Sequence, residues 1–194
     1  MEVLKSEGRH DYSGASKLID LIERIHDIEG LKRIRIGSLE PRIITEAFAN
    51  RLAKLSKICP HFHLSLQSGC DATLKRMNRH YSPEEYFQSV QLLRQAFGRP
   101  AITTDVIVGF PGETEEEFLV TKAFLEKIGF YEMHIFKYSK RKGTIAANMP
   151  GQVPDSIKTQ RSNILLELEH VQSKEFRSFY IDRDVEVLFE ESKE

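Results

Sequence analysis

One aspartate stands inside an otherwise apolar run at residues 101–109, and a Gly-Phe-Pro-Gly turn follows directly. A carboxylate that is buried without a partner destabilises a fold by several kcal/mol. Asp105 therefore needs a partner, which could be Arg33, Arg35, a histidine or a bound ligand. A purely structural ion pair is the alternative reading of the same residue.

Further polar groups follow the other strand-like segments of the chain. Ligands of parallel α/β folds bind at the carboxyl ends of strands, so these are candidate binding groups. These groups lie at 38–41, 67–69, 109–113 and 138–141. They comprise hydrogen-bond acceptors, amides, a glycine turn and cations, and none of them is a nucleophile beside a base. This chemistry suits the binding of a polar cofactor.

The elements that would position these groups alternate along the chain. Ser82 with Pro83, and Thr114 with Glu117, are helix-start signals, and Gly30, Gly98 and Gly129 follow predicted helices. The patterns predict strands at 31–39, 61–67, 101–109, 131–138 and 185–191, and helices at 17–30, 42–57, 71–77, 82–97, 115–128 and 155–181. Such alternation with short connections is typical of an α/β fold with a parallel sheet or barrel.

The predicted strands each have one apolar and one more polar face. Successive side chains of a strand point in opposite directions, so Phe62, Leu64 and Leu66 share one face. The opposite faces carry His61, His63, Ser65, Gln67, Thr103, Asp105, Glu132, His134, Arg33 and Arg35. Because a closed barrel is filled with apolar side chains, this pattern favours a partial barrel around a polar cavity.

Composition restricts the function classes only weakly. The 194 residues carry 28 Lys and Arg against 29 Asp and Glu, for a net charge of -1. The whole-chain charge therefore predicts neither nucleic-acid nor membrane binding, although a local basic patch is compatible with it. The two cysteines do not make a disulfide framework, and we expect a cytoplasmic protein.

Four stretches carry a family resemblance. "RIRIGSLEPR", "HFHLSLQSGCDATLKRMNRHYSPEEY", "TTDVIVGFPGETEEEF" and "FKYSKRKGTIAANMPGQVP" occur in order over about 31–154. As a set they resemble the radical S-adenosylmethionine (SAM) methylthiotransferases. The resemblance implies a partial (β/α) barrel of the radical SAM type over 1–154, with about four of its six strands. A connecting helix at 155–182 and the start of a β-barrel RNA-binding domain at 183–194 would follow.

The resemblance also implies roles for side chains at matching positions. Glu40 would accept a hydrogen bond from the methionine amine of SAM, and Arg79 would pair with its carboxylate. Gln67 would face the ribose or the methionine part, and Asp105 would accept from a ribose hydroxyl. Charge-assisted hydrogen bonds of this kind are the strong ones.

The turn after Asp105 would place its backbone near the adenine, with Gly109 and Gly112 as cofactor-binding positions. It lacks the Gly-Lys-Ser/Thr of a phosphate loop. Structural alternatives stay open: Glu40 could cap the next helix, Arg79 could form a surface salt bridge, and Gln67 could satisfy a backbone group. The glycines could serve only a sharp strand-to-helix connection.

Radical SAM enzymes hold a [4Fe-4S] cluster with three cysteines in a CxxxCxxC loop, which this sequence lacks. Cys59 and Cys70 are separated by 11 positions, and we assign no metal ligand to the chain. The resemblance places the cluster loop before residue 1. We therefore expect an inactive fragment with weak or no SAM affinity, whose full-length parent uses SAM and [4Fe-4S] clusters.

The stretch 137–142, "KYSKRK", holds four cations in six residues, and Lys140, Arg141 and Lys142 are candidate RNA contacts. A solvated loop is the alternative. The resemblance implies tRNA as the partner and methylthiolation of threonylcarbamoyladenosine at carbon 2, because "SLEP" and "SLQSGCD" resemble that branch. Isopentenyladenosine, a ribosomal protein, or a non-catalytic α/β binding module are the other readings.

Unpaired strand edges give one further expectation. The strand at 31–38 should pair on one side with 61–67, and its other edge would be a template for a second chain. The terminal strand at 185–191 would also need a partner. We expect the chain to self-associate, more through the terminal strand than through the arginine strand.

Overall fold

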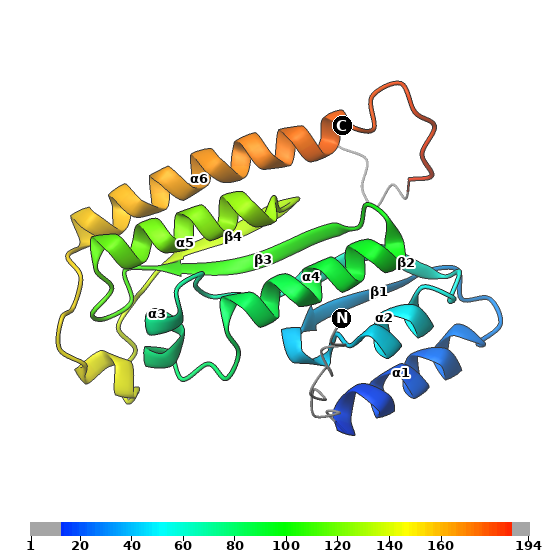
Figure 1. The fold of residues 1–194 in the computed structure, drawn as a ribbon, viewed down its shortest axis with the longest axis horizontal. Helices are drawn as coiled ribbons and strands as arrows, with labels where there is room; N and C mark the ends of the chain where they lie inside the picture. The colour runs from blue at the N-terminus through cyan, green and yellow to red at the C-terminus, as the bar shows by residue number, and fades with distance from the viewer. Residues whose placement is uncertain (1–12, 188–194) are drawn as a thin grey trace, which may run out of the picture.

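A computed structural model describes residues 13–187, and its centre is a parallel four-stranded sheet in the order β1-β2-β3-β4 (Figure 1). The strands are β1 (Ile34–Leu39), β2 (Ile58–Leu64), β3 (Ala101–Val108) and β4 (Glu132–Lys137). Neighbours in the sheet are also neighbours in the sequence, as successive β-α-β units require. The predicted parallel α/β sheet is confirmed.

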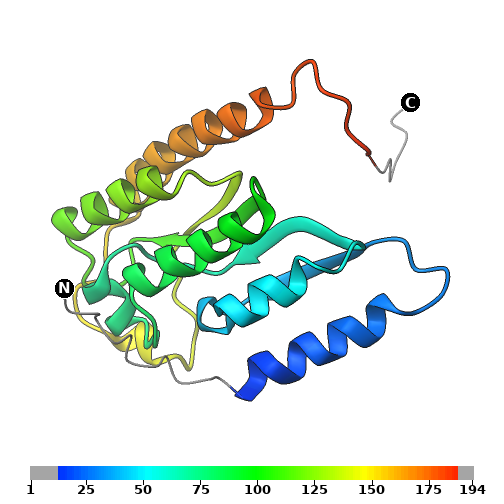
Figure 2. The same cartoon turned by 45° about the vertical axis from the view of Figure 1, so that its right-hand side comes forward.

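Helices connect the strands and cover one face of the sheet. They are α1 (Ser13–His26), α2 (Glu46–Leu52), α3 (Asp71–Arg76), α4 (Pro83–Phe97), α5 (Glu115–Ile128) and α6 (Asp155–Ser178). Two 3-10 turns, η1 (Pro41–Ile43) and η2 (Ile145–Asn148), complete the described elements. In Figure 2, α1, α2, α4 and α5 follow one another across the sheet, in colours from blue to yellow-green.

The core lies between the sheet and this helix layer. Phe62, Leu64, Ile102 and Val106 are buried on the helix side of β2 and β3, against helical side chains such as Tyr86. On the other face Arg35, His134 and Phe136 are exposed. The predicted strand parity is thus confirmed, and the polar face forms the inner wall of a partial barrel.

The helix signals read from the sequence act as expected. Ser82 accepts from the backbone N–H of Glu85, whose carboxylate accepts from the N–H of Ser82 in return. Thr114 and Glu117 form the same reciprocal capping box at the start of α5. At each helix start, two backbone N–H groups that have no partner within the helix are satisfied, which fixes where these helices begin.

The helix predicted at 17–30 is α1 (Ser13–His26), which ends before Gly30, and the strand predicted at 61–67 is β2 (Ile58–Leu64). Two other predicted elements differ more strongly from the structure. The helix expected at 42–57 is instead η1 followed by the shorter α2, because the Thr45 hydroxyl accepts from Phe48 N–H at 3.1 Å and starts a new helix. The strand expected at 185–191 is not formed at 185–187, which have no regular structure, and its remainder lies outside the described residues. Within 13–187 no helix is both long and apolar enough to cross a membrane.

Candidate functional site

Two cavities lie next to each other at the carboxyl ends of the strands. The first has a volume of about 370 Å³ and is lined by Glu40, Arg79, Tyr81 and Ser65, among others. The second, of about 460 Å³, is lined by Gln67, Asp105, Tyr138 and Arg141 with several apolar side chains. Ser65 of the first cavity and Gln67 of the second are two residues apart in the chain, so the two cavities are neighbours. The structure therefore gathers five of the residues predicted from the sequence.

Glu40 and Arg79 face the first cavity with different partners. The Glu40 carboxylate accepts from Arg42 Nε at 2.6 Å and does not cap η1. Arg79 is exposed, and among residues 13–187 it has no ion-pair partner. Neither the capping role for Glu40 nor the surface salt bridge for Arg79 matches the structure, so both groups remain candidates for ligand contacts.

Gln67 has an unusual backbone conformation, and its backbone links β2 to β3 beyond the end of their regular pairing. Its φ is 69°, in the left-handed region that side chains other than glycine seldom adopt. Its N–H donates to Asp105 O and its carbonyl accepts from Ile107 N–H, both at 2.9 Å. These bonds fix Gln67 at the rim of the second cavity, and within the described chain its side-chain amide has no hydrogen-bond partner.

Tyr138 belongs to the candidate binding groups predicted at 138–141, but no individual role was predicted for it. Its side chain lines the second cavity, and its hydroxyl is buried and has no hydrogen-bond partner in the described part of the chain. Its ring meets Phe110 edge to face, with ring centres 5.3 Å apart. A buried hydroxyl is usually paired, so this one is suited to a polar ligand group. Its place directly after β4 was the signal for it.

Asp105 finds its partner in a histidine of the neighbouring strand. His63 Nε2 lies 3.4 Å from Asp105 Oδ2, and the Asp105 side chain keeps 30% of its surface exposed. The candidate arginines are engaged elsewhere: Arg35 Nη2 lies 3.1 Å from His61 Nε2, and Arg33 Nε donates to Cys59 Sγ at 3.4 Å. Of the partners considered from the sequence, the structure selects a histidine.

The glycine turn holds a carboxylate of its own chain. Gly109 N–H donates to Glu113 Oε2 at 2.6 Å, and Gly112 N–H donates to Gly151 O at 2.8 Å. Glu113 is 6% exposed and also accepts from Arg161 Nη1 of α6 at 2.7 Å. Burial raises the pKa of Glu113, while Gly109 N–H and Arg161 oppose that rise.

Gly109 has little freedom to vary. Its φ is +70°, and a Cβ at this position would come within 2.4 Å of Lys158 Cγ. The turn is therefore a rigid link between β3, α5 and α6. The role of Gly109 and Gly112 as cofactor-binding positions stays a prediction, and their N–H groups already have partners within the chain.

The predicted RNA contacts lie on the exposed loop after β4. Lys140, Arg141 and Lys142 are all exposed, and Arg141 also lines the second cavity. The Arg141 carbonyl accepts from the Thr144 hydroxyl at 2.9 Å, which orders the loop. The patch therefore stands at the mouth of the cavity where an extended polyanion could reach it.

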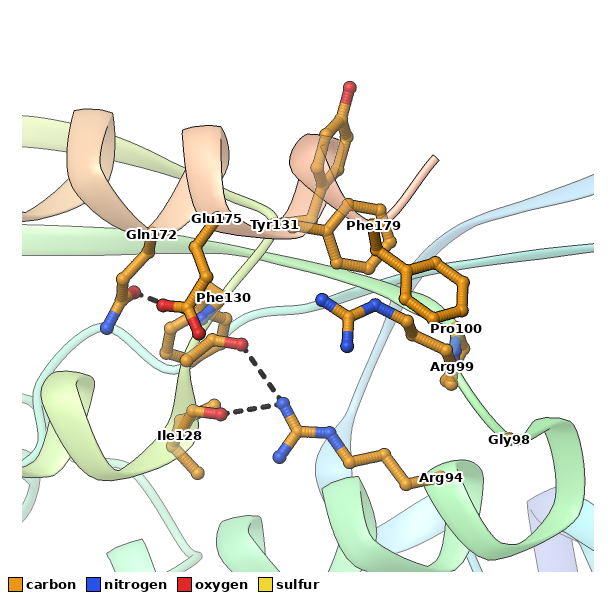
Figure 3. Close-up of a pocket in the computed structure, with 12 residues that line it drawn as sticks. Arg94, Gly98, Arg99, Pro100, Ile128, Phe130, Tyr131, Gln172, Glu175 and Phe179 are labelled. Carbon is orange, nitrogen blue, oxygen red and sulfur yellow. Dashed lines mark hydrogen bonds between the residues drawn. The ribbon is translucent and has the colours of Figure 1, made fainter. Parts of the chain in front are cut away.

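A further cavity lies at the opposite, amino-terminal end of β3 and β4. It has a volume of about 650 Å³ and is bordered by Arg94, Arg99, Tyr131, Gln172 and Phe179 (Figure 3). Arg94 Nη2 donates to the carbonyls of Ile128 and Gly129, so it satisfies the end of α5. The dashed lines in Figure 3 show that Arg94 and Gln172 bind the protein itself, which makes this cavity the weaker site candidate.

Residues 11–125 match the family model described as "Radical SAM superfamily". The chain belongs to the radical SAM superfamily. A relative from Thermoanaerobacter sp. (strain X514), named tRNA-2-methylthio-N(6)-dimethylallyladenosine synthase, is 44% identical over 88% of this chain and 36% of its own length. The Threonylcarbamoyladenosine tRNA methylthiotransferase MtaB of Bacillus subtilis is 42% identical over 96% of this chain and 41% of its own length. The chain thus spans about two fifths of the length of these relatives.

The fold agrees with solved radical SAM structures. Coproporphyrinogen III oxidase (HemN) from Escherichia coli, described as a radical SAM enzyme, aligns with a TM-score of 0.60 at 19% identity, over 81% of this chain and 36% of that chain. At this identity the match establishes the fold alone. The predicted radical SAM type of partial barrel is confirmed, and the family implies SAM and a [4Fe-4S] cluster as cofactors.

The residues of the two cavities fit SAM better than they fit the cluster. A guanidinium and a buried hydroxyl that have no partner within 13–187, together with a carboxylate, suit a zwitterionic, hydroxyl-rich molecule. The sequence holds two cysteines, fewer than a three-cysteine cluster requires. Cys59 is half-buried beside Arg33, and Cys70 is buried at the start of α3. These two thiols do not make the cluster site.

Proposed function

We propose that this chain is part of a tRNA methylthiotransferase that modifies carbon 2 of N6-threonylcarbamoyladenosine next to the anticodon. The observation that carries the proposal is the first cavity, where the Glu40 carboxylate faces the same space as Arg79, which has no ion-pair partner among residues 13–187. A cation and an anion so placed complement the carboxylate and the amine of an amino acid such as the methionine part of SAM.

The second cavity supports the other half of the cofactor. Asp105 and the Gln67 amide offer hydrogen-bond partners for ribose hydroxyls, and the Tyr138 hydroxyl offers one more. When bound, SAM and the cluster would supply the radical chemistry of the superfamily. This chain would bind and orient SAM, and the three cluster cysteines would come from outside its 194 residues.

Basic side chains at the cavity mouth support a tRNA substrate. Lys140, Arg141 and Lys142 would contact phosphates, which position a nucleic acid without reading its sequence. The relatives at 44% and 42% identity carry names from two branches, so identity does not separate dimethylallyladenosine from threonylcarbamoyladenosine. The stretches "SLEP" and "SLQSGCD" favour the second branch through their resemblance, and the first branch is the alternative substrate.

The SAM affinity of the whole protein containing this chain, loaded with its cluster, tests the cofactor contacts. Replacing Arg79→Ala should raise the dissociation constant for SAM by about 10- to 100-fold, because one charge-assisted contact is lost. Arg24→Ala, which removes an exposed cation on α1, is the matched control and should leave the constant unchanged. Equal SAM affinity of the Arg79→Ala and Arg24→Ala proteins would contradict the assignment.

A further inference from the structure

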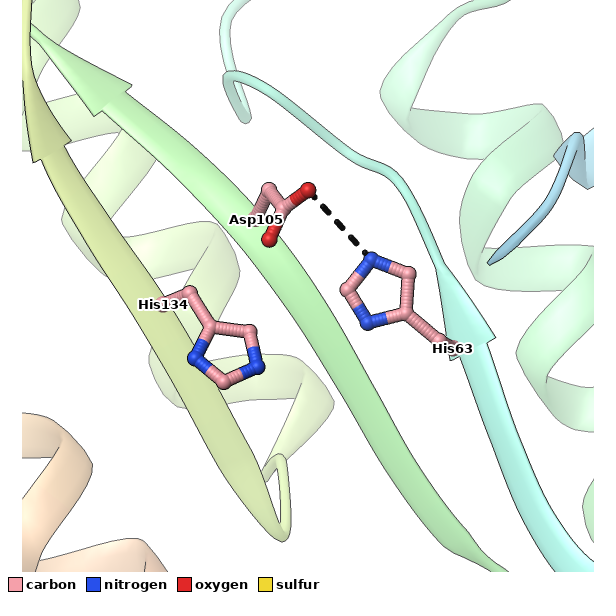
Figure 4. A group of neighbouring side chains, drawn as sticks. All are labelled: His63, Asp105 and His134. Atoms are coloured by element: carbon pink, nitrogen blue, oxygen red, sulfur yellow. Dashed lines mark ion pairs between the residues drawn. The ribbon is translucent and has the colours of Figure 1, made fainter. Parts of the chain in front are cut away.

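Three neighbouring strands bring two histidines and an aspartate together on the inner face of the sheet. Asp105 of β3 and His134 of β4 are register partners, and His63 lies near the end of β2 on the other side of Asp105 (Figure 4). One potential ligand atom from each residue lies within 4.8 Å of the other two. Asp105 and His134 are level in the sheet, and His63 is level with Thr103, two residues before Asp105 on the same face, so the sheet itself holds the cluster together.

The His63 ring is oriented by a buried hydroxyl. Thr103, 2% exposed, is the register partner of His63 and places its Oγ1 3.1 Å from His63 Nδ1. A threonine hydroxyl either donates or accepts, so Nδ1 is held whichever nitrogen carries the proton. This directs Nε2 toward Asp105. Histidines that ligate metals are commonly fixed through their other nitrogen in the same way.

The spacing of the His63–Asp105 pair is that of two ligands of one ion. Nε2 and Oδ2 are 3.4 Å apart, longer than the usual charge-assisted hydrogen bond of about 2.7–2.9 Å. Two ligand atoms that each lie about 2.1 Å from a tetrahedral ion are about 3.4 Å apart. The His134 ring lies roughly parallel to that of His63, with centres 6.0 Å apart, and its exposed side chain is free to adjust.

We propose that His63, Asp105 and His134 form a site for one divalent transition-metal ion of the zinc or iron class. Two imidazoles and one carboxylate favour such ions over magnesium or calcium, which prefer oxygen ligands. Within residues 13–187 no other histidine, cysteine or acidic group completes this cluster. At least one coordination position of the ion is therefore directed at the inner face, beside the second cavity, where a water or a ligand group can occupy it.

This proposal does not rest on the proposed function. Asp105 also takes part in the suggested cofactor contact, but His134 does not line either of the two cavities. A defect confined to metal binding in a His134 variant therefore separates the two proposals.

Titration of the 194-residue chain with Co²⁺ and Zn²⁺ tests the site. We expect one ion per chain, with visible Co²⁺ absorption of the tetrahedral type that Zn²⁺ abolishes. His134→Ala should weaken binding at least about tenfold, and Thr103→Val should weaken it by about 10- to 100-fold through the misplaced His63 ring. His134 is exposed, so its variant keeps the fold, which circular dichroism verifies.

Two control variants exclude other ligands. His170→Ala removes an exposed histidine of α6, and Cys59→Ser removes the half-buried thiol of β2. Both proteins should bind the ion as the unchanged chain does. Absence of stoichiometric binding, binding that survives His134→Ala undiminished, or binding that is lost with Cys59→Ser would each overturn the proposal.

Discussion

Glu117 joins α3 to the start of α5 through one carboxylate. It accepts from Arg76 Nη1 of α3 at 2.9 Å, from the Thr73 hydroxyl at 3.3 Å and from Thr114 N–H at 3.1 Å. Its side chain is 17% exposed. The hydrogen bond from Arg76 is the largest cause that lowers the pKa of Glu117 below its ordinary value of 4.5.

A lowered pKa makes this contribution depend on pH. The charged carboxylate stabilises the fold at pH values above about 4.5, and the contribution is lost as the pH falls through the lower folded pKa. Glu117→Gln should therefore reduce the free energy of unfolding by about 1–3 kcal/mol at pH 7. The difference from the unchanged chain should shrink as the pH falls below 4.5.

Urea unfolding at several pH values measures this difference. Glu167→Gln, an exposed glutamate of α6, is the control and should change stability by less than about 0.5 kcal/mol throughout. A constant Glu117→Gln effect down to low pH would show that the carboxylate charge is not the cause.

Single residues also mark the limit of sequence reasoning. The cost of burying a charge was enough to predict that Asp105 has a partner, and the strand register decided which one, since it aligns His63 with Thr103. Tyr138 was among the candidate groups at 138–141 without a predicted role, because an unpaired hydroxyl can be identified only when its surroundings are known. Strand parity also placed His63 and Asp105 on the same face. Their distance to His134, however, depends on the order and register of the strands in the sheet.

At the scale of elements, the turn after β3 is fixed by α6. The Glu113 carboxylate accepts from Arg161, and Arg161 Nη2 also donates to Glu115 Oε2 at 3.0 Å. Arg161 is 5% exposed, so the charge it carries requires these acids. The long helix thereby holds the rim of the second cavity in place, although it lies 46 or more residues away in the sequence.

The loop after β4 carries the prediction on nucleic acid. Replacing Lys140, Arg141 and Lys142 together by Ala should weaken tRNA binding by the whole protein. The slope of log affinity against log salt should fall by up to about 3, because each cation accounts for one phosphate contact.

Filter binding over a range of salt concentrations measures both effects. The charge-matched control replaces Lys17, Arg24 and Lys54, exposed cations on and beside the outer helices, by Ala. If the control and the loop variant have the same affinity and salt slope, the loop does not contact tRNA.

Element boundaries could be predicted where caps decide them. The Ser82 cap, the Thr114–Glu117 capping box and the stop at Gly129 were readable because the groups that form them are close in the sequence. The break within the helix predicted at 42–57 was not readable, because the apolar pattern continues past Thr45, where the cap starts a new helix. At 185–187 a strand pattern is present without regular structure, since a strand requires a neighbouring strand for its hydrogen bonds.

At the scale of the whole molecule, β1 pairs only with β2 within the described residues. The expectation that such an edge leads to self-association stays a prediction. The polar inner wall, the two cavities and the basic loop are all on the side where the strands end, which is the binding side of parallel α/β folds. Alternation and parity therefore predicted the binding side of the sheet, whereas the roles of the individual residues came from the family resemblance and stay predictions.

The central claim is that the protein containing this chain methylthiolates threonylcarbamoyladenosine in tRNA. Mass spectrometry of tRNA nucleosides from a strain without the corresponding gene tests it most directly. We predict that 2-methylthio-N6-threonylcarbamoyladenosine disappears, that its unmethylthiolated form accumulates, and that the 2-methylthio derivative of isopentenyladenosine is unchanged. Unaltered 2-methylthio-N6-threonylcarbamoyladenosine in that strain would contradict the claim.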